Sequence, residues 1–191
     1  MAQSTSWCNL LRNTAFYLLL QDIDRDLARA LRAEGCPRCG SRLHFARYAR
    51  KPRGAPQDLP ADFDRRESLC CSADGCRRRA CPPSLRFFGR RLYLGPVFVL
   101  ACVLVHGITV KRAAVLHDLV GVSIRTLARW RRWWLASFPC TVFWKDARAR
   151  FMPPVDESAL PSALLERFLA PDDSLRLQAM LSFLAPLSGG T

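Results

Sequence analysis

Two stretches, CPRC at residues 36–39 and CCSADGC at residues 70–76, decide how this chain of 191 residues can fold. Two residues separate Cys36 from Cys39, and four residues separate Cys71 from Cys76. Paired cysteines at this spacing are typical of a zinc ribbon, in which two tight turns each supply two thiolates to one tetrahedral Zn²⁺. The sequence therefore predicts a structural zinc site with Cys36, Cys39, Cys71 and Cys76 as its ligands.

The third ligand has an alternative, because Cys70 lies directly before Cys71. Cys71 gives the C-x4-C spacing and is preferred, but the sequence leaves both open. Cys81 is a weaker candidate, five residues beyond Cys76. His44 could extend the first pair to the C-x2-C-x4-H pattern of a zinc knuckle. That motif needs a further cysteine near position 49, where an alanine stands.

The remaining cysteines, Cys8, Cys102 and Cys140, have apolar neighbours in the sequence and are predicted to lie in the core. Nine cysteines behind an N-terminus without the pattern of a secretory signal favour a reducing compartment and metal binding over disulfides. We therefore expect a cytoplasmic protein. The apolar run at residues 92–108 is short for a membrane span and contains Gly95, Pro96 and Gly107, so we expect a buried helix and no membrane partner.

Positive charge is confined to the middle of the chain. The whole sequence carries 29 Lys and Arg against 16 Asp and Glu, a net charge of +13. Residues 36–134 hold 20 of those basic groups and six acidic ones, so the two flanking segments are close to neutral. Only three basic residues are Lys, which fits a GC-rich coding sequence, but that bias does not explain the confinement. A basic block of this kind attracts polyanions such as nucleic acids, so we expect the protein to be associated with the nucleoid.

Apolar spacing predicts a mainly α protein with a small β insert that forms the zinc ribbon. A helix is expected over residues 14–34, ended by Gly35. We divide the chain into an N-terminal helix (1–35), the zinc ribbon with a basic extension (36–91), a helix-turn-helix-like domain (92–138), and a linker followed by C-terminal amphipathic helices (139–191).

Residues 109–138 have the pattern of a helix-turn-helix unit. Helices are predicted over 110–119 and 124–138, with Gly121 in the turn and Ser123 as the cap of the second helix. The expected core positions are Leu116, Val120, Val122, Leu127 and Trp130, all of them apolar. The N-terminal residues of the second helix would reach base edges and the others would contact phosphates. The predicted DNA contacts are Arg77, Arg78, Arg79, Arg90, Arg91, Lys111, Arg112, Ser123, Arg125, Thr126, Arg129 and Arg132.

The zinc-ribbon spacing, the basic stretch and the helix-turn-helix pattern together resemble the N-terminal DNA-binding region of bacterial insertion-sequence transposases. The matching segments are GCPRCGSRL, CCSADGCRRRACPPSLRFF and residues 109–134. CRRRACPPSLRFFGRR also looks like a block found in short transposon-associated proteins. The resemblance implies a DNA-binding accessory or regulator of transposition. Transposases of this kind continue into a catalytic domain, whereas only 57 residues follow Trp134, so we expect no enzyme activity.

Two other functions remain open at the level of sequence. Zinc ribbons also serve as protein-interaction adaptors, and the apolar segment 160–187 could contact a second copy of the chain or a transposase. A basic ribbon does not by itself distinguish DNA from RNA, so RNA binding is a variant of the first hypothesis. No Ser-His-Asp pattern, P-loop or HExxH motif points to an enzyme.

Overall fold

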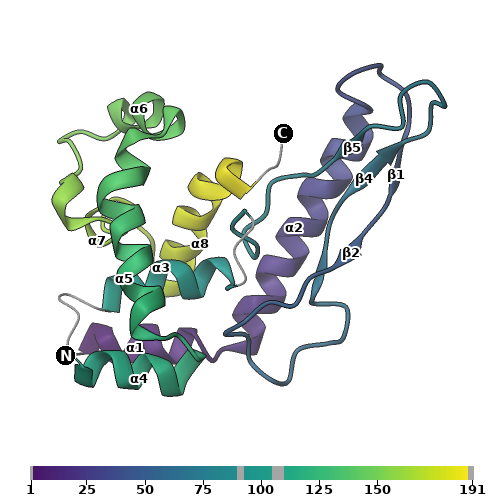
Figure 1. Cartoon of the computed structure of the whole chain (residues 1–191). Coiled ribbons are helices and arrows are strands. Elements are labelled where there is room, and N and C mark those ends of the chain that lie inside the picture. The colour runs from purple at the N-terminus through teal and green to yellow at the C-terminus, as the bar shows by residue number, and fades with distance from the viewer. Residues whose placement is uncertain (1, 90–92, 105–109, 189–191) are drawn as a thin grey trace.

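The computed structural model describes residues 2–89, 93–104 and 110–188, and it is mainly helical (Figure 1). The α-helices are α1 (Ala2–Leu10), α2 (Thr14–Glu34), α3 (Gly95–Leu104), α4 (Val110–Val120), α5 (Ile124–Arg132), α6 (Val142–Ala147), α7 (Ser162–Leu165) and α8 (Asp173–Leu184). The strands are β1 (Leu43–Phe45), β2 (Tyr48–Ala49), β3 (Arg65–Arg66), β4 (Leu69–Cys71) and β5 (Arg79–Ala80). Helix α5 continues into a π-helical turn (Trp133–Ser137), and single 3-10 turns occupy Phe138–Cys140, Arg148–Arg150, Glu157–Ala159 and Ala185–Ser188.

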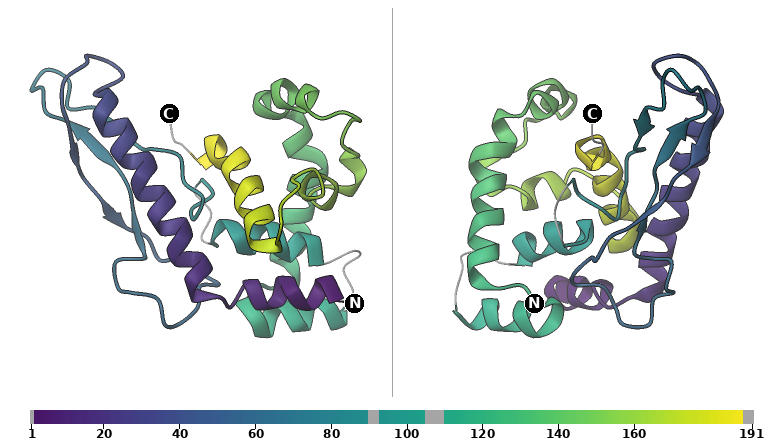
Figure 2. Two further views of the ribbon diagram at one scale, coloured as in Figure 1. Left: turned by 180° about the vertical axis from the view of Figure 1, so that it is seen from behind. Right: turned by 45° about the vertical axis from the view of Figure 1, so that its right-hand side comes forward.

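The strands form two small antiparallel sheets. One has the order β1-β4-β5 and the other pairs β2 with β3. In all three views of Figures 1 and 2 these strands lie along α2, and α5 and α6 lie on the opposite side of the molecule, with α3 and α8 between the two. The chain therefore has a strand-bearing arm, formed by α2 and the strands, and a helical arm, formed by α5 and α6 with the preceding helix α4. Helices α3 and α8 lie between the two arms.

Helix α2 has the bounds that the sequence predicts. Its first turn is capped by Asn13, whose side chain accepts a hydrogen bond from the Phe16 amide at 3.2 Å. Gly35 ends the helix with φ +86°, and a Cβ there would lie only 2.8 Å from the carbonyl oxygen of Gly40. This tight exit brings the chain directly from the helix into the first cysteine turn.

Helix α3 is the buried helix predicted for the apolar run. Every residue from Gly95 to Cys102 is buried, and Pro96 occupies the first turn as expected. Gly95 is required by packing, because a Cβ there would lie 2.5 Å from the carbonyl oxygen of Leu85. Within the described ranges, no helix combines the length and the apolar character that crossing a membrane requires.

One hydrophobic core crosses the predicted domain boundaries. It takes side chains from α1, α2, residues 85–88 and 93–94, α3, α4, α5 and α8. A second, much smaller cluster consists of Cys36, Leu43, Leu69 and Cys71, with Leu31 of α2 packed against it. Within the described residues, the cysteine segment, defined here as residues 36–81, therefore has a small second core, while its Phe63 is buried in the main one.

Two expectations for the C-terminal part need correction. The segment 139–191, expected to hold a linker and then C-terminal helices, begins instead with the short helix α6, which Thr141 caps by accepting a hydrogen bond from the Trp144 amide. Segment 160–187 does form the expected pair of helices, with Asp172 as the cap of α8. However, its main apolar side chains, Leu177, Met180, Leu181 and Leu184, are buried in the core and do not form an exposed partner face.

Candidate metal centre and basic helix face

Two similar turns hold the four predicted ligands. In the first, the Gly40 amide donates to the Cys36 carbonyl at 2.8 Å and the Cys36 amide donates to the Ser41 carbonyl at 2.9 Å. In the second, the amides of Cys76 and Arg77 both donate to the Ala73 carbonyl at 3.0 Å. The residue after the last cysteine of each turn has positive φ, +70° at Gly40 and +42° at Arg77.

Strand alternation selects Cys71 as the third cysteine of the cluster. In the register of β1 and β4, Cys71 lies opposite Leu43 and Leu69 lies opposite Phe45. Because alternate residues of a strand share a face, Cys71 points with Leu69 into the small core, whereas Cys70 points the other way. The Cys70 thiol contacts the Arg77 carbonyl at 3.6 Å. The sequence left Cys70 and Cys71 open, and the period of two in the strand resolves them.

The four sulfur atoms fit a tetrahedral metal ion. The Sγ atoms of Cys36, Cys39, Cys71 and Cys76 all lie within 4.8 Å of one another. Cys36 Sγ is 3.8 Å from Cys76 Sγ, and Cys39 Sγ is 3.5 Å from Cys71 Sγ. A Zn²⁺ ion with four Zn–S bonds of about 2.3 Å needs sulfur–sulfur edges of about 3.8 Å. All nine cysteines are free thiols, so this cluster could hold a metal ion.

The first turn also favours loss of the protons from two of the thiols, those of Cys36 and Cys39. Hydrogen bonds from the side chain and backbone of Ser41 lower the pKa of Cys39 to about 6. Backbone amides of Arg38 and Cys39 lower the pKa of Cys36. For Cys71 the Ala73 amide lowers the pKa, but burial and the neighbouring thiols outweigh it and raise the pKa to about 12. A cation at the centre would replace the protons that these thiols otherwise share.

The other cysteines lie outside the cluster. The Cys81 thiol donates to Ser68 Oγ at 3.7 Å, and His44 is an exposed residue of β1. Cys102 is buried as predicted and Cys8 is half-buried. The prediction for Cys140 is wrong: it is exposed, because the 3-10 turn that holds it directs Phe138 into the core instead.

The turn between α4 and α5 brings the five predicted core positions together. Leu116, Val120, Val122, Leu127 and Trp130 are all buried. Gly121 has φ +65° and donates to the His117 carbonyl at 2.7 Å, and the Tyr93 hydroxyl donates to the Gly121 carbonyl at 3.0 Å. Trp130 and Trp134 pack on Phe98 of α3, with ring centroids 5.3 and 5.4 Å apart. These tryptophans are therefore core residues.

The opposite face of α5 is basic. Arg125, Arg129 and Arg132 are exposed, and among the described residues none of the three has an ion-pair partner. Their spacing of four and three residues places them on one side of the helix, spread over about 10 Å. Ser123 caps the helix by accepting from the Thr126 amide at 3.3 Å, as predicted. We call Arg125, Arg129 and Arg132 the basic face.

The structure separates the predicted DNA contacts into two groups. Arg77, Arg78 and Arg79 are exposed beside the second cysteine turn, near the C-terminal end of α2. The α4–α5 turn lies toward the other end of the molecule, close to α1 (Figure 1). Arg90 and Arg91 lie outside the described residues, as do the side chains of Lys111 and Arg112.

A buried ion pair was missed by the sequence analysis. Arg86 donates through Nε to Asp24 Oδ2 at 2.8 Å, and both side chains are fully buried. Asp24 also accepts from Ser84 Oγ at 2.5 Å and from the Leu85 amide at 2.7 Å, and Arg86 donates to the Phe63 carbonyl at 2.6 Å. Arg86 therefore belongs to the structural core, although the sequence places it in a basic stretch. An Asp inside the apolar pattern of α2 was the only signal for it.

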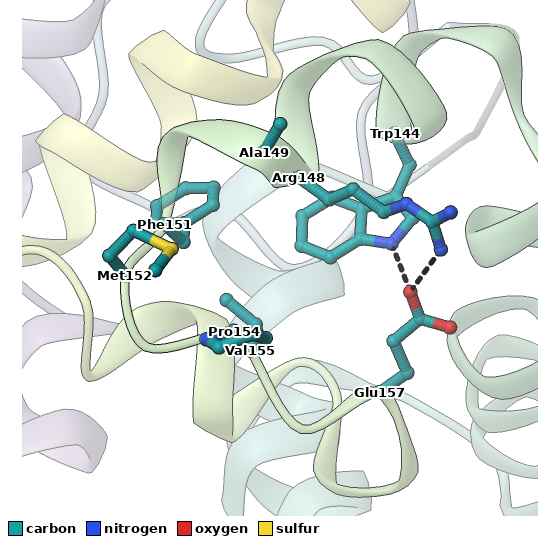
Figure 3. Close-up of a pocket in the computed structure, with 8 residues that line it drawn as sticks. All are labelled: Trp144, Arg148, Ala149, Phe151, Met152, Pro154, Val155 and Glu157. Carbon is teal, nitrogen blue, oxygen red and sulfur yellow. Dashed lines mark hydrogen bonds and ion pairs between the residues drawn. The ribbon is translucent and has the colours of Figure 1, made fainter.

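One cavity of about 330 Å³ lies in the C-terminal part, between the Trp144 indole and Phe151, Met152 and Val155 (Figure 3). At its rim, Glu157 accepts from Trp144 Nε1 at 2.7 Å and pairs with Arg148 at 3.5 Å. The residues that line it include neither the four cysteines nor the basic face. The cavity is therefore not part of either predicted site.

No family model, curated protein or solved structure matches this chain. The fold and the site thus define its class on their own: a mainly helical protein with a strand-bearing segment in which four cysteines could hold a metal ion.

Proposed function

We propose that this chain is a DNA-binding protein in which the basic face of α5 enters the major groove and a structural Zn²⁺ holds the cysteine segment together. The observation that carries the proposal is the exposed row of Arg125, Arg129 and Arg132 on a helix whose opposite side is fully packed. A role in transposition, as an accessory or regulator, rests on the sequence resemblance.

The arrangement of α5 supports contact with a groove. The helix follows α4 after a short turn, and its outward side presents Ser123 and Arg125 at the N-terminus and Arg129 and Arg132 beyond them. In a helix-turn-helix the first residues of the second helix approach base edges, and later residues approach phosphates. Because these arginines have no protein partner within the described ranges, binding a phosphate would break no ion pair there.

Duplex DNA fits this face better than duplex RNA. The major groove of B-DNA is about 12 Å wide and admits an α-helix. The major groove of A-form RNA is too deep and narrow for side-chain readout. A helix that offers its whole basic side is therefore suited to DNA, and RNA remains the alternative that competition experiments decide.

The proposed zinc has a structural role. Four thiolates complete a tetrahedral shell, and a complete shell of protein ligands is characteristic of structural sites. Cys36 and Cys71 make up half of the buried residues in the small core, so the segment depends on its ligands for a large part of its interior. This supports a binding role rather than a catalytic one.

The test measures zinc content and DNA affinity in one preparation. We expect one zinc per chain, and we expect binding of a fluorescein-labelled DNA duplex, followed by anisotropy, to weaken steeply as salt is raised. Chelation should lower the affinity, because the cysteine segment with Arg77–Arg79 would lose its fold. An RNA duplex of the same sequence should compete poorly.

A variant of the basic face provides the decisive comparison. Changing Arg125, Arg129 and Arg132 to Gln should reduce the slope of log K against log salt by up to about 2.7, since each lost phosphate contact contributes about 0.9. The matched control changes three exposed basic residues at the other end of the helical arm, Lys145, Arg148 and Arg150, to Gln. Equal effects of the two triple variants would overturn the proposal, and zinc-loaded protein that binds no DNA would favour an adaptor.

A further inference from the structure

The long loop between β2 and β3 is held against the helical arm at the start of the α4–α5 turn. We propose that its basic part, residues 50–56, is a second DNA-binding element that places Lys51 and Arg53 on phosphates beside the groove occupied by α5. This inference rests on the proposed function and adds two residues and a second contact point to it. We call residues 50–56 the basic loop.

The basic loop is fixed at both of its ends. At its beginning, the Arg50 amide donates to the Asp64 carbonyl at 2.8 Å and the Arg50 guanidinium donates to the Gly89 carbonyl at 3.1 Å. Further along, Ala55 and Leu59 pack against the main core. The loop is thus attached to the helical core rather than projecting freely from the small sheets.

Its centre touches the turn before α5. Arg53 forms an isolated parallel bridge with Tyr93, and the Leu94 amide donates to the Arg53 carbonyl at 3.3 Å. A Cβ on Gly54 would lie 3.0 Å from Val97 and 3.4 Å from Val120, the residue directly before Gly121. Because consecutive Cα atoms are about 3.8 Å apart, Arg53 lies within a few residue lengths of the turn that begins the basic face.

The acidic and the basic residues of the loop between β2 and β3 differ in their contacts. Two of the three acidic residues between β2 and β3 are engaged with α2: Asp58 accepts from Thr14 Oγ1 at 2.7 Å, and Asp62 pairs with Arg25 at 2.7 Å. Lys51 and Arg53 are exposed, and neither has an ion-pair partner within the described ranges. Residues 50–56 contain three basic and no acidic side chains, so the basic loop itself is positively charged, although the whole loop at residues 50–64 is neutral.

The basic loop is already ordered in the folded chain, which suits it to a second contact with DNA. A free loop would have to be ordered on binding, which costs conformational entropy for each residue fixed. The basic loop is already held by backbone hydrogen bonds and by the close approach of Gly54 to α3 and α4. Phosphate contacts from such an element fix the orientation of a helix in the groove and carry no sequence information themselves.

The experiment uses the full chain and the same labelled DNA duplex in a salt titration. The test variant changes Lys51 and Arg53 to Gln, and the matched control changes Lys145 and Arg150 to Gln, which removes the same charge from exposed positions far from the turn. We expect the test variant to reduce the salt slope by about 1–2 and the control to leave it unchanged. The charge-preserving variant Lys51→Arg/Arg53→Lys should bind as the unmodified protein does.

Failure of this inference is distinguishable from failure of the proposed function. If the variant of the basic face loses affinity while the Lys51/Arg53 variant behaves like the Lys145/Arg150 control, the loop proposal is wrong and the role of α5 stands. If the unmodified chain binds no DNA duplex at any salt concentration, both are wrong. Thermal melting of each variant checks that the lost affinity is not lost folding.

Discussion

Arg86 lies against Asp24 with its Nε 2.8 Å from Oδ2, and neither side chain has any exposed surface. The pair joins the middle of α2 to the segment that leaves the cysteine turns, and Asp24 accepts two further hydrogen bonds there. Removing one partner of a buried ion pair leaves an uncompensated charge, which costs about 3–5 kcal/mol. The crossing of α2 and this segment is therefore tied together by electrostatics as well as by packing.

Asp24→Ala is expected to lower the free energy of unfolding by about 3–5 kcal/mol, because it leaves the buried Arg86 guanidinium without its carboxylate partner. Urea denaturation followed by circular dichroism measures this. The matched control is Asp26→Ala, which removes an exposed carboxylate that pairs with Arg29 on the same helix. An exposed pair contributes at most about 1 kcal/mol, so equal losses in the two variants would contradict the structural role of Asp24.

Cys71→Ser and Cys70→Ser are expected to behave differently although they change neighbouring residues. Cys71 contributes its sulfur to the cluster, so its loss should abolish stoichiometric zinc binding. Cys70 points to the other face of β4, so its replacement should leave one zinc per chain. Native mass spectrometry measures the zinc content of the two variants directly. Loss of zinc in the Cys70 variant alone would reverse the ligand assignment.

Arg77→Gly should stabilise the second cysteine turn. Arg77 has φ +42°, a conformation that costs a residue with a Cβ about 1 kcal/mol and costs glycine nothing. Gly40 already occupies the equivalent place in the first turn. We expect a thermal midpoint equal to or above that of the unmodified protein, whereas Arg78→Gly, one residue further, should lower it. A lower midpoint for Arg77→Gly would show that its exposed pair with Asp74 contributes more than the backbone costs.

In metal-free protein that keeps its two cysteine turns, Cys39 should be the thiol of the cluster that iodoacetamide alkylates fastest near neutral pH, whereas the thiols should react alike if the segment unfolds. Its pKa is lowered to about 6 by Ser41, so it is largely thiolate at pH 7, and its rate should fall as the pH drops through about 6. Cys71, whose pKa is raised to about 12, should stay protonated and react slowly at the same pH. Peptide mapping by mass spectrometry follows both, and Ser41→Ala should move the Cys39 profile to higher pH.

The sequence was sufficient where the deciding signal is local. The bounds of α2, the Ser123 cap and the core positions of α4 and α5 follow from apolar period and capping residues, and the structure has them as predicted. The four cysteines follow from spacing, since only two or four residues separate the members of each pair and a short turn brings them together. Cys71 could also have been selected from sequence by treating LCC at residues 69–71 as a strand.

Features that depend on distant partners could not be predicted in this way. Nothing in the spacing shows that Arg86 meets Asp24, 62 residues away, so its charge was counted with the basic block. Likewise, the apolar side chains of α8 could have faced a partner or the core, and only the packing against α1 and α3 decides between these. The position of the basic loop depends on Gly54, whose contact with Val120 has no local signature.

The two hydrophobic clusters divide the chain into parts with different sources of stability. The main cluster is large and aromatic, whereas the small one has four buried residues, of which two are the cysteines Cys36 and Cys71. A protease added to metal-depleted protein should therefore cut near the small cluster, within residues 37–45 and 69–81, because the metal no longer links the cysteines there. It should spare the main cluster, which also holds Ala55 and Phe63. In a cell, the availability of the metal would then determine how long the cysteine segment resists proteolysis, and the helical arm would resist it for longer.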